Sequence, residues 1–462
     1  MENRYEIVKS FIKDQIETAK LKSGDKLPSI RNLAEKLNVC NSTVINAYRK
    51  LEQENIIYSV PKSGYYIFTP KNTSIMYGDH EIADLSKAIP ANDLLPYIEF
   101  KNCLDQAIAL HKESLFTYSN PQGFEGLRSS LAKYYMEEQI FTSISNMIIT
   151  AGAYQALFIL AKMPFPNGNS NILVEQPTYS GMLKILNIEN INTIGIERTI
   201  KGIDLETLEA IFRSGSIKFF YLMPRFQNPT GFSYTKEQKL NIIKLAARYN
   251  VYIVEDDFLA DLEIDMKNDS FFSMSQIPNV INIRSYSKTF LPGIRIASVI
   301  LPKLLVNDFL RYKKLYDIGN STLYQAALQL FIDSGMLNRH VKIIKKEYED
   351  RIAEMKKYTE IASSLGFVLY TSYTGFFGYL KTPDNISSKR LAGLLKSNNT
   401  YLAETQEMFL PGFFRDDSLR LSICNLDKNS INQGISSAFQ SIGKFMSLAN
   451  KNNLPDEEMF LQ

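Results

Sequence analysis

The chain has 462 residues, of which 45% are hydrophobic and 22% charged. This length exceeds one ordinary hydrophobic core and predicts two or three folded units. No apolar run reaches the roughly 20 residues of a bilayer-spanning helix, and the charged start lacks the apolar segment of a signal peptide. Three widely spaced cysteines and three histidines argue against disulfide and metal sites. We therefore expect a cytoplasmic protein with no metal and no membrane partner.

The net charge of +3 lies entirely in the first 70 residues. They contain 11 Lys and Arg against 8 Asp and Glu, whereas the remainder contains 41 of each. An excess of this size is a weak sign of nucleic-acid binding, but it indicates where such binding is to be sought.

The N-terminal pattern predicts a small DNA-binding domain. Apolar residues recur at helical spacing over residues 5–18, Ser29 is placed to cap a second helix, and Asn41 or Ser42 to cap a third. Two β-rich runs, IIYSV and YYIF, follow and are joined by PKSG, which predicts a hairpin. Three helices and a hairpin are typical of a winged helix-turn-helix, whose third helix enters the major groove. The alternative is a small helical domain that binds a protein partner.

The sequence GDKLPSIRNLAEKLNVCNSTVINAYRKLEQENII, followed by KSGYYIF, resembles the DNA-binding domain of the GntR family of bacterial regulators. The resemblance implies a winged helix-turn-helix over residues 1–69 that binds promoter DNA. The family usually has Ser-Arg where this chain has Cys40-Asn41, and an asparagine there can read adenine. The residues implied to contact DNA are Arg31 in the second helix, Asn41, Ser42 and Thr43 in the third, and Lys62, Ser63 and Gly64 in the wing.

The remainder of the chain predicts an α/β domain. Residues 70–84 are polar and without periodicity, which predicts a linker. Over residues 85–462, helical stretches alternate with short β-branched runs, which indicates a largely parallel sheet. The predicted strands are 147–150, 171–176, 219–223, 251–256, 280–285 and 296–301. Ligands of such sheets bind at the carboxyl ends of the strands, so the polar residues there are site candidates.

One such stretch, SYSKTFLPGIR, contains Lys288, whose amine can form a Schiff base with an aldehyde. Another, the small-residue turn AGAYQAL, opens a helix whose first backbone amides can bind phosphate. The groups suited to a phosphate are the side chains of Ser285, Ser287 and Arg295 and the amides of Gly152, Ala153 and Tyr154.

Two further candidates follow predicted strands. Asp256 ends the run VYIVED and can keep a pyridine nitrogen protonated, and Asn228 precedes a Pro-Thr-Gly turn. Taken singly, each candidate has an ordinary explanation: a surface lysine, a small-residue turn, a structural carboxylate or a turn asparagine. Together they fit one cofactor, pyridoxal 5′-phosphate.

The motifs YSNPQGFEGLR, TAGAYQAL, QPTY, QNPTG, EDDF, SYSKTFLPGIR and LRLSI occur in an order that resembles fold-type I aminotransferases over residues 85–445. The resemblance implies a large domain with a mostly parallel sheet, a small domain, and a homodimer. Phe258 stands where relatives often have a tyrosine, which would leave Asn228 as the main partner of the ring hydroxyl. The implied roles are an internal aldimine on Lys288, a ring-nitrogen partner in Asp256, a ring-stacking Tyr179, a Tyr118 that reaches the partner subunit's cofactor, and a carboxylate clamp in Arg420.

A GntR-type head on an aminotransferase-like body resembles the MocR-type transcriptional regulators. The resemblance implies a head-to-tail homodimer that binds promoter DNA. Its body would sense pyridoxal phosphate, or a small amine that reacts with it at Lys288, without sustained turnover. The alternative is an active aminotransferase that acts on an amino acid and a 2-oxo acid. The intact winged-helix sequence favours the regulator, because a pure enzyme has no use for that head.

Overall fold

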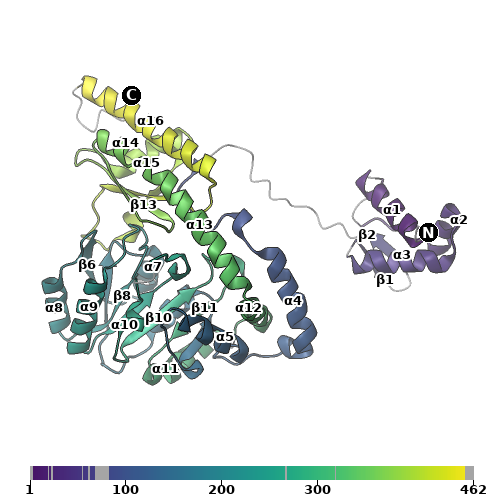
Figure 1. Cartoon of the computed structure of the whole chain (residues 1–462), viewed down its shortest axis with the longest axis horizontal. Helices are drawn as coiled ribbons and strands as arrows, with labels where there is room; N and C mark the ends of the chain where they lie inside the picture. Colours follow the sequence, from purple (N-terminus) through teal and green to yellow (C-terminus); the bar gives the residue numbers. More distant parts are fainter. Residues whose placement is uncertain are drawn as a thin grey trace. The chain divides into compact units, whose positions relative to one another are not determined.

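The computed structural model describes residues 4–18, 20–21, 24–54, 56–60, 63–67, 83–265, 268–317 and 319–452. The chain forms two compact units, residues 1–81 and 82–462, which we call the head and the body (Figure 1). Lys62 of the predicted wing and residues 70–82 of the predicted linker lie outside the described residues.

The head has the predicted order of three helices and an antiparallel hairpin. Val8, Leu33, Val44 and Ile67 belong to its single buried core. The Ser29 hydroxyl caps the second helix, as predicted, by accepting a hydrogen bond from a backbone N–H. The elements are α1 (Arg4–Glu17), α2 (Ile30–Leu37), α3 (Asn41–Gln53), β1 (Ile57–Val60) and β2 (Gly64–Ile67).

The cap predicted for α3 is wrong, because Cys40 rather than Asn41 or Ser42 holds that position. Cys40 is still extended, with φ −77° and ψ 153°, and the helix begins at Asn41. The Cys40 thiol lies 3.1 Å from the Ser42 hydroxyl and 2.9 Å from the Thr43 hydroxyl. These two hydrogen bonds, Ser42 first, lower the pKa of the Cys40 thiol to about 7. Asn41 is the first residue of α3, and its side chain is exposed.

The body contains the mostly parallel sheet that the sequence predicts, with eight strands in the order β4-β11-β10-β9-β8-β5-β6-β7. Strands β6, β5, β8, β9 and β10 are parallel, β11 is antiparallel to both of its neighbours, and β7 is antiparallel to β6. The bounds are β4 (Met147–Thr150), β5 (Asn171–Gln176), β6 (Thr193–Thr199), β7 (Gly202–Ile203), β8 (Ile217–Leu222), β9 (Tyr252–Asp256), β10 (Val280–Ser285) and β11 (Ala297–Ile300).

Helices cover both faces of this sheet. In β8, Phe219 and Tyr221 pack into the cluster of one face, whereas Phe220 and Leu222 pack into the cluster of the other. This alternation explains why four consecutive residues of β8, Phe219 to Leu222, are hydrophobic. One face is covered by α6 (Ala153–Lys162), α7 (Ser180–Ile188) and α11 (Lys303–Tyr316), and the other by α8 (Leu205–Arg213), α9 (Lys236–Arg248) and α10 (Phe271–Met274). A third cluster joins α4 (Tyr97–His111), α5 (Glu125–Met136) and α12 (Thr322–Asp333) beside β4 and β11.

The small domain is a second sheet, antiparallel, in the order β12-β13-β16-β15. Ala83 and Asp84 form β3, the first strand of the body, which pairs in parallel with β14 (Thr400–Tyr401). The sheet strands are β12 (Val368–Thr371), β13 (Phe377–Lys381), β15 (Ala403–Glu404) and β16 (Ser418–Ser422). The helices of the same buried cluster are α13 (Met336–Lys356), α14 (Thr359–Ser364), α15 (Ser388–Ser397) and α16 (Lys428–Asn452).

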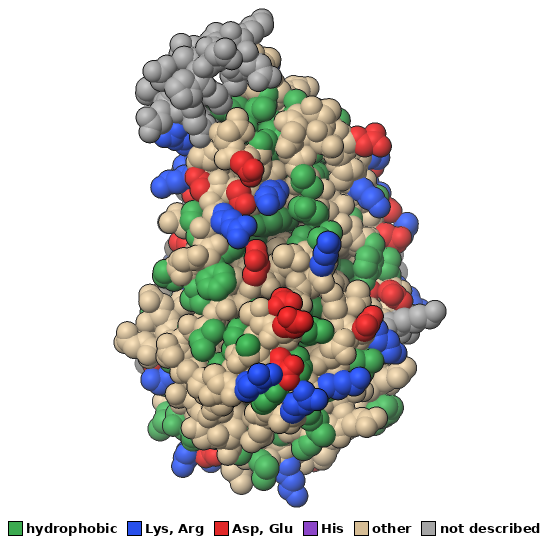
Figure 2. All heavy atoms as spheres, turned by 90° about the vertical axis from the view of Figure 1, so that its left-hand side faces the viewer, with side chains coloured by type: hydrophobic (Ala, Val, Ile, Leu, Met, Phe, Trp, Pro, Cys, Tyr) green, Lys and Arg blue, Asp and Glu red, His purple; other side chains and the backbone are tan. Residues whose placement is uncertain are grey.

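The surface shown in Figure 2 carries acidic and basic side chains interspersed with each other, in agreement with the charge balance of the body sequence. Among the helices of the described residues, none is both long and apolar enough to cross a bilayer.

Candidate functional site

A pocket of about 270 Å³ lies at the carboxyl ends of the large-sheet strands, where they face the small domain. The large domain supplies the loops after β4, β5, β8, β9 and β10, and the small domain supplies β13 and β16. This is the edge at which α/β sheets bind ligands. The predicted site residues that line the pocket are Ala153, Tyr154, Tyr179, Asn228, Asp256, Ser285, Ser287, Lys288, Arg295 and Arg420.

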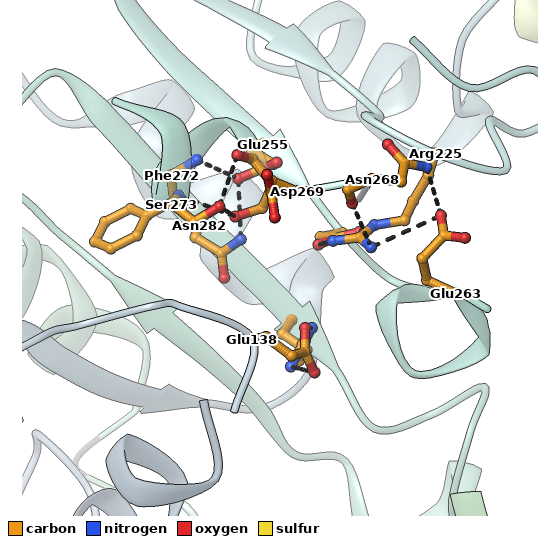
Figure 3. A network of polar contacts seen from close by, with 12 residues as sticks. Glu138, Arg225, Glu255, Glu263, Asn268, Asp269, Phe272, Ser273 and Asn282 are labelled. Carbon is orange, nitrogen blue, oxygen red and sulfur yellow. Dashed lines mark hydrogen bonds and ion pairs between the residues drawn. The ribbon is translucent and has the colours of Figure 1, made fainter. Parts of the chain in front are cut away.

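Three consecutive carboxylates lie at the end of β9 and directly after it, and two of them are engaged away from the pocket. Glu255 accepts hydrogen bonds from the N–H of Phe271 at 2.7 Å and from Asn282 at 3.1 Å. Asp257 accepts two hydrogen bonds from the Arg225 guanidinium, one from Nε and one from Nη2, each at 2.8 Å. Figure 3 shows this network, with Asn282 beside Glu255 and Arg225 turned toward Glu263.

Asp256 points to the opposite face of β9 and lines the pocket. One carboxylate oxygen, Oδ2, accepts a hydrogen bond from Tyr221 at 2.9 Å. The other oxygen, Oδ1, is buried and has no hydrogen-bond partner in the described part of the chain. Burial raises the pKa of Asp256 to about 7, against the effect of the Tyr221 bond, which lowers it. A buried carboxylate with one free oxygen is suited to a cationic N–H donor.

Lys288 follows β10 and presents its amine at the same pocket. Burial, followed by the nearby Arg420 and Arg295 guanidinium groups, lowers the pKa of the Lys288 amine. A lowered pKa increases the neutral, nucleophilic fraction of a lysine, as covalent chemistry at an amine requires.

A phosphate cradle lies beside Lys288. Gly152 adopts φ +85° directly before α6, whose first amides are open to an anion. A Cβ on Gly152 would lie only 2.5 Å from Arg295 Nη2, so the guanidinium lies directly against the backbone of the helix N-terminus. Arg295 also donates to the Ser287 hydroxyl at 3.1 Å. Ser285 ends β10 close by and lines the pocket.

The small domain contributes Arg420 from β16. Arg420 is only 7% exposed, donates through Nη1 to Asn228 Oδ1 at 2.9 Å, and lies 5.0 Å from the centre of the Phe377 ring. It forms no ion pair with any described carboxylate, and its Nε is buried without a partner. Burial lowers its pKa to about 10. A buried guanidinium without a counter-charge is suited to an anionic ligand.

These features fit pyridoxal 5′-phosphate. The orphaned Asp256 Oδ1 suits a protonated ring nitrogen, the Gly152–Arg295 cradle suits a phosphate, and the Lys288 amine suits an aldehyde. Tyr179 directly precedes α7 at the pocket wall. Its ring packs against Gly181, since a Cβ added to Gly181 would lie 2.4 Å from the Tyr179 ring.

One predicted site residue lies elsewhere. Tyr118 is 89% exposed and lies in a separate surface hollow beside Phe116, outside the pocket of its own chain. In the described part of the chain, no group of three or more His, Cys, Asp or Glu side chains is arranged to hold a metal.

Sequence reasoning missed Tyr221, whose hydroxyl is the partner of Asp256. The only local sign was one hydroxyl within the apolar run FFYLM. It also missed the backbone carbonyls of Ser86 and Ala88, which accept hydrogen bonds from Arg420 and Lys288. A carbonyl is present in every residue, so no side-chain pattern can indicate this contact.

In the head, the predicted DNA contacts lie on α2, α3 and the hairpin. Arg31 is exposed on α2, and Asn41 and Ser42 are exposed at the start of α3. Thr43 is half-buried, and the Ser63 hydroxyl lies 2.5 Å from the Tyr66 hydroxyl. Gly64 begins β2 with φ +125°.

Known proteins resemble each unit. Residues 4–67 match the family described as bacterial regulatory proteins, gntR family, and residues 84–437 match aminotransferase class I and II. The HTH-type transcriptional regulator YcxD of Bacillus subtilis (strain 168), itself described as uncharacterized, is 36% identical over 94% of this chain and 98% of its own length. The HTH-type transcriptional regulator NorG of Staphylococcus aureus (strain USA300) is 26% identical over 71% of this chain and 79% of its own.

Solved structures resemble the body. The kynurenine aminotransferase of Pyrococcus horikoshii has a TM-score of 0.73 at 22% identity, covering 79% of this chain and 92% of its own. LysN, the alpha-aminoadipate aminotransferase of Thermus thermophilus, has the same score and identity over 80% and 94%. At this identity the likeness establishes the fold-type I aminotransferase fold alone. With both family matches in one chain and regulators as full-length relatives, this protein belongs to the aminotransferase class I and II family and, through its GntR head, to the MocR-type transcriptional regulators.

Proposed function

We propose that this protein is a transcriptional regulator whose body holds pyridoxal 5′-phosphate at Lys288 and whose head binds promoter DNA according to the state of that pocket. The observation that carries the proposal is the pair of buried, unpartnered polar atoms around the Lys288 amine. Asp256 Oδ1 lacks a donor and Arg420 Nε lacks an acceptor in the described residues. Such atoms recur elsewhere in the described residues, but here two of opposite charge line one pocket, where a single ligand would satisfy both.

When bound, pyridoxal phosphate supplies an aldehyde that condenses with primary amines. Asp256 would hold a proton between its free oxygen and the ring nitrogen. The Asn228 amide, whose oxygen is taken by Arg420, would donate its N–H to the ring hydroxyl. Phe258 lines the pocket without a hydroxyl, which supports Asn228 as the main partner of that oxygen. The ring would be covered by Tyr179, and the phosphate held by Ser285, Ser287, Arg295 and the amides of Gly152, Ala153 and Tyr154.

Arg420 would hold the carboxylate of an effector amine. It already reaches the pocket from the small domain, so an effector bound between Lys288 and Arg420 would contact both lobes. Such a ligand shifts a conformational equilibrium only by its different affinities for the two states. If pyridoxal phosphate is itself the effector, Arg420 contributes nothing to sensing.

We propose a homodimer in which Tyr118 reaches the partner subunit's phosphate. Its exposure fits a residue that functions across an interface. Neighbouring large apolar side chains of the same segment are also exposed, which is the usual sign of a covered surface. They are Tyr97, Ile98, Leu110 and Phe116, on α4 and the 3₁₀-helix that follows it. Figure 1 shows α4 along one flank of the body. The head-to-tail arrangement, in which two heads read a repeated operator, is part of this proposal.

The test is the visible absorbance of the purified protein with pyridoxal phosphate, followed by borohydride reduction and peptide mapping. Wild type should gain an absorbance band and a mass addition on the peptide containing Lys288. Lys288→Ala should have neither. Lys303→Ala removes an exposed lysine on α11 and should behave as wild type. A band that survives in Lys288→Ala would refute the assignment.

The second candidate function is a working aminotransferase, because Lys288, Asp256 and Asn228 all line the pocket. Amino acids added with a 2-oxo acid decide between the two. A band that shifts with one amine and then stays constant supports a sensor, whereas continuous turnover supports the enzyme.

A further inference from the structure

The first described segment of the body crosses the candidate site. Residues 84–91, here called the strap, begin at the last residue of β3 and run beside β16 of the small domain. The N–H of Ser422 donates to the Leu85 carbonyl at 2.7 Å, and the N–H of Ala91 donates to the Cys424 carbonyl at 3.0 Å. The Leu85 side chain is 0% exposed in the small-domain core. The strap is therefore anchored at both ends to the small domain.

Between these anchors, two strap carbonyls accept hydrogen bonds from Arg420 and Lys288, the two basic side chains that the proposed function expects to bind the ligand. The Ser86 carbonyl accepts a hydrogen bond from Arg420 Nη2 at 2.6 Å. The Ala88 carbonyl accepts one from the Lys288 amine, and Ala88 lines the pocket. Lys288 belongs to the large domain, so this second contact also ties the strap across the two lobes.

The contact at Arg420 is made on the nitrogen that a carboxylate needs. A carboxylate can accept two hydrogen bonds from a guanidinium, either from Nε and Nη2 or from Nη1 and Nη2. Nη2 is therefore a donor in both arrangements. Nη1 is engaged by Asn228 and Nη2 by the neutral Ser86 carbonyl. The Ser86 carbonyl takes one of the two Nη2 hydrogens, and a carboxylate, which carries a full negative charge where the carbonyl is neutral, competes well for it.

We propose that the strap is a built-in competitor of the effector, and that its release carries the state of the pocket into the chain that leads to the head. This inference rests on the proposed function. Pyridoxal phosphate, whose aldehyde would condense with the Lys288 amine and release water, would remove the free amine that donates to Ala88, and an effector carboxylate would compete with the Ser86 carbonyl for Arg420 Nη2. An effector amine that displaces Lys288 from the cofactor frees this amine again, so the part of strap release that an effector adds is the competition of its carboxylate for Arg420.

Hydrogen exchange of the full-length protein, read by mass spectrometry over residues 84–91, tests strap release. Pyridoxal phosphate should speed exchange in the strap. We then compare the common L-amino acids with the amines formed by their decarboxylation. Amino acids that shift the absorbance band should speed strap exchange further, whereas their matched amines should not. If strap exchange is unchanged while the absorbance band reports cofactor at Lys288, the inference is overturned. If no amino acid in the panel speeds strap exchange, the part of the inference that concerns Arg420 is overturned. Absence of the absorbance band refutes the proposed function instead.

Two matched variants test whether the strap itself competes. Leu85→Ala and Leu391→Ala each shorten a leucine that is 0% exposed in the same core cluster, but Leu391 lies on α15. Leu85→Ala should bind pyridoxal phosphate about fivefold more tightly, the equivalent of one net hydrogen bond of about 1 kcal/mol. Leu391→Ala should not. Equal effects would mean that general loosening of the small domain, and not the strap, is responsible.

The coupling to the head is tested on an operator selected from random DNA. Wild type and Leu391→Ala should change their DNA affinity when the pocket is filled. Leu85→Ala should have a DNA affinity that no longer depends on the ligand. A Leu85→Ala protein that still responds as wild type does would overturn the coupling. If either variant fails to fold, strap exchange in wild type still decides the first part of the inference.

Discussion

At the scale of single residues, hydrogen-bond partners separate Asp256 from its neighbours. Glu255 and Asp257 are as deeply buried, but each has several donors, whereas Asp256 has one. Burial raises the pKa of Asp256, the single Tyr221 hydrogen bond offsets only part of this effect, and the nearby Asp257 charge raises the pKa further. A cationic donor at Oδ1 would reverse this effect. The free oxygen therefore disfavours ionisation of Asp256 in the unliganded protein, and a cationic ligand would relieve this effect.

The raised pKa of Asp256 predicts that the stability of the folded protein depends on pH. Because the folded-state pKa of Asp256 is about 7 and its ordinary value is 3.8, the folded protein binds the extra proton between these values. Stability contributed by this group is present below pH 3.8 and is lost as the pH rises to about 7. The free energy of unfolding of Asp256→Asn should therefore rise relative to that of cofactor-free wild type across this window, by up to about 4 kcal/mol. Urea denaturation at several pH values measures the difference. A constant difference would contradict the prediction.

At the scale of an element, the start of α6 requires a glycine for two separable reasons. Gly152 needs φ +85°, and Arg295 leaves no room for a Cβ. Gly152→Ala should displace Arg295 from the cradle and weaken pyridoxal phosphate binding at least about tenfold, the loss of about 1.4 kcal/mol from one charge-assisted contact. Gly168→Ala is the matched control, because Gly168 has φ +71° with open space around it. Cofactor titration followed by absorbance compares them, and equal affinities would refute the cradle.

The helices of the head have their own prediction. Arg31 is exposed on α2, and a guanidinium there suits a DNA contact. Arg31→Ala should weaken binding to a mapped operator by about 1 to 3 kcal/mol and lower the salt dependence by about one counterion. Lys303→Ala removes one positive charge from the body and serves as control. Fluorescence anisotropy at several salt concentrations gives both quantities, and unchanged values for Arg31→Ala would mean that the head docks differently.

At the scale of the whole molecule, the exposed apolar side chains around α4 predict the oligomeric state. Phe116 is 68% exposed beside Tyr118, and Phe141, in a different hollow, is 69% exposed. Phe116→Asp should favour the monomer, because dimerisation would bury the new charge. Phe141→Asp should remain dimeric. Sedimentation velocity distinguishes the two, and a dimeric Phe116→Asp protein would place the interface elsewhere.

Much of this fold could be predicted because it depends on local patterns. The runs 147–150, 171–176 and 280–285 coincide with β4, β5 and β10, since strands buried on both faces are built around apolar, often β-branched residues such as Ile149, Val174 and Ile283. Lys288, Asp256 and Asn228 converge because each follows a parallel strand, and parallel strands end at one edge of their sheet.

The sequence by itself thus determined the two-unit architecture, the strands and the edge at which the site lies, because periodicity and strand-end position are properties of neighbouring residues. Only the tertiary structure decided which carboxylate keeps a free oxygen, that Cys40 precedes α3, and that the strap covers Arg420. Asp257 is engaged by a guanidinium 32 positions away, and Arg420 by a carbonyl 334 positions away. Burial and hydrogen-bond partners depend on how distant segments pack, and that information is absent from any local pattern.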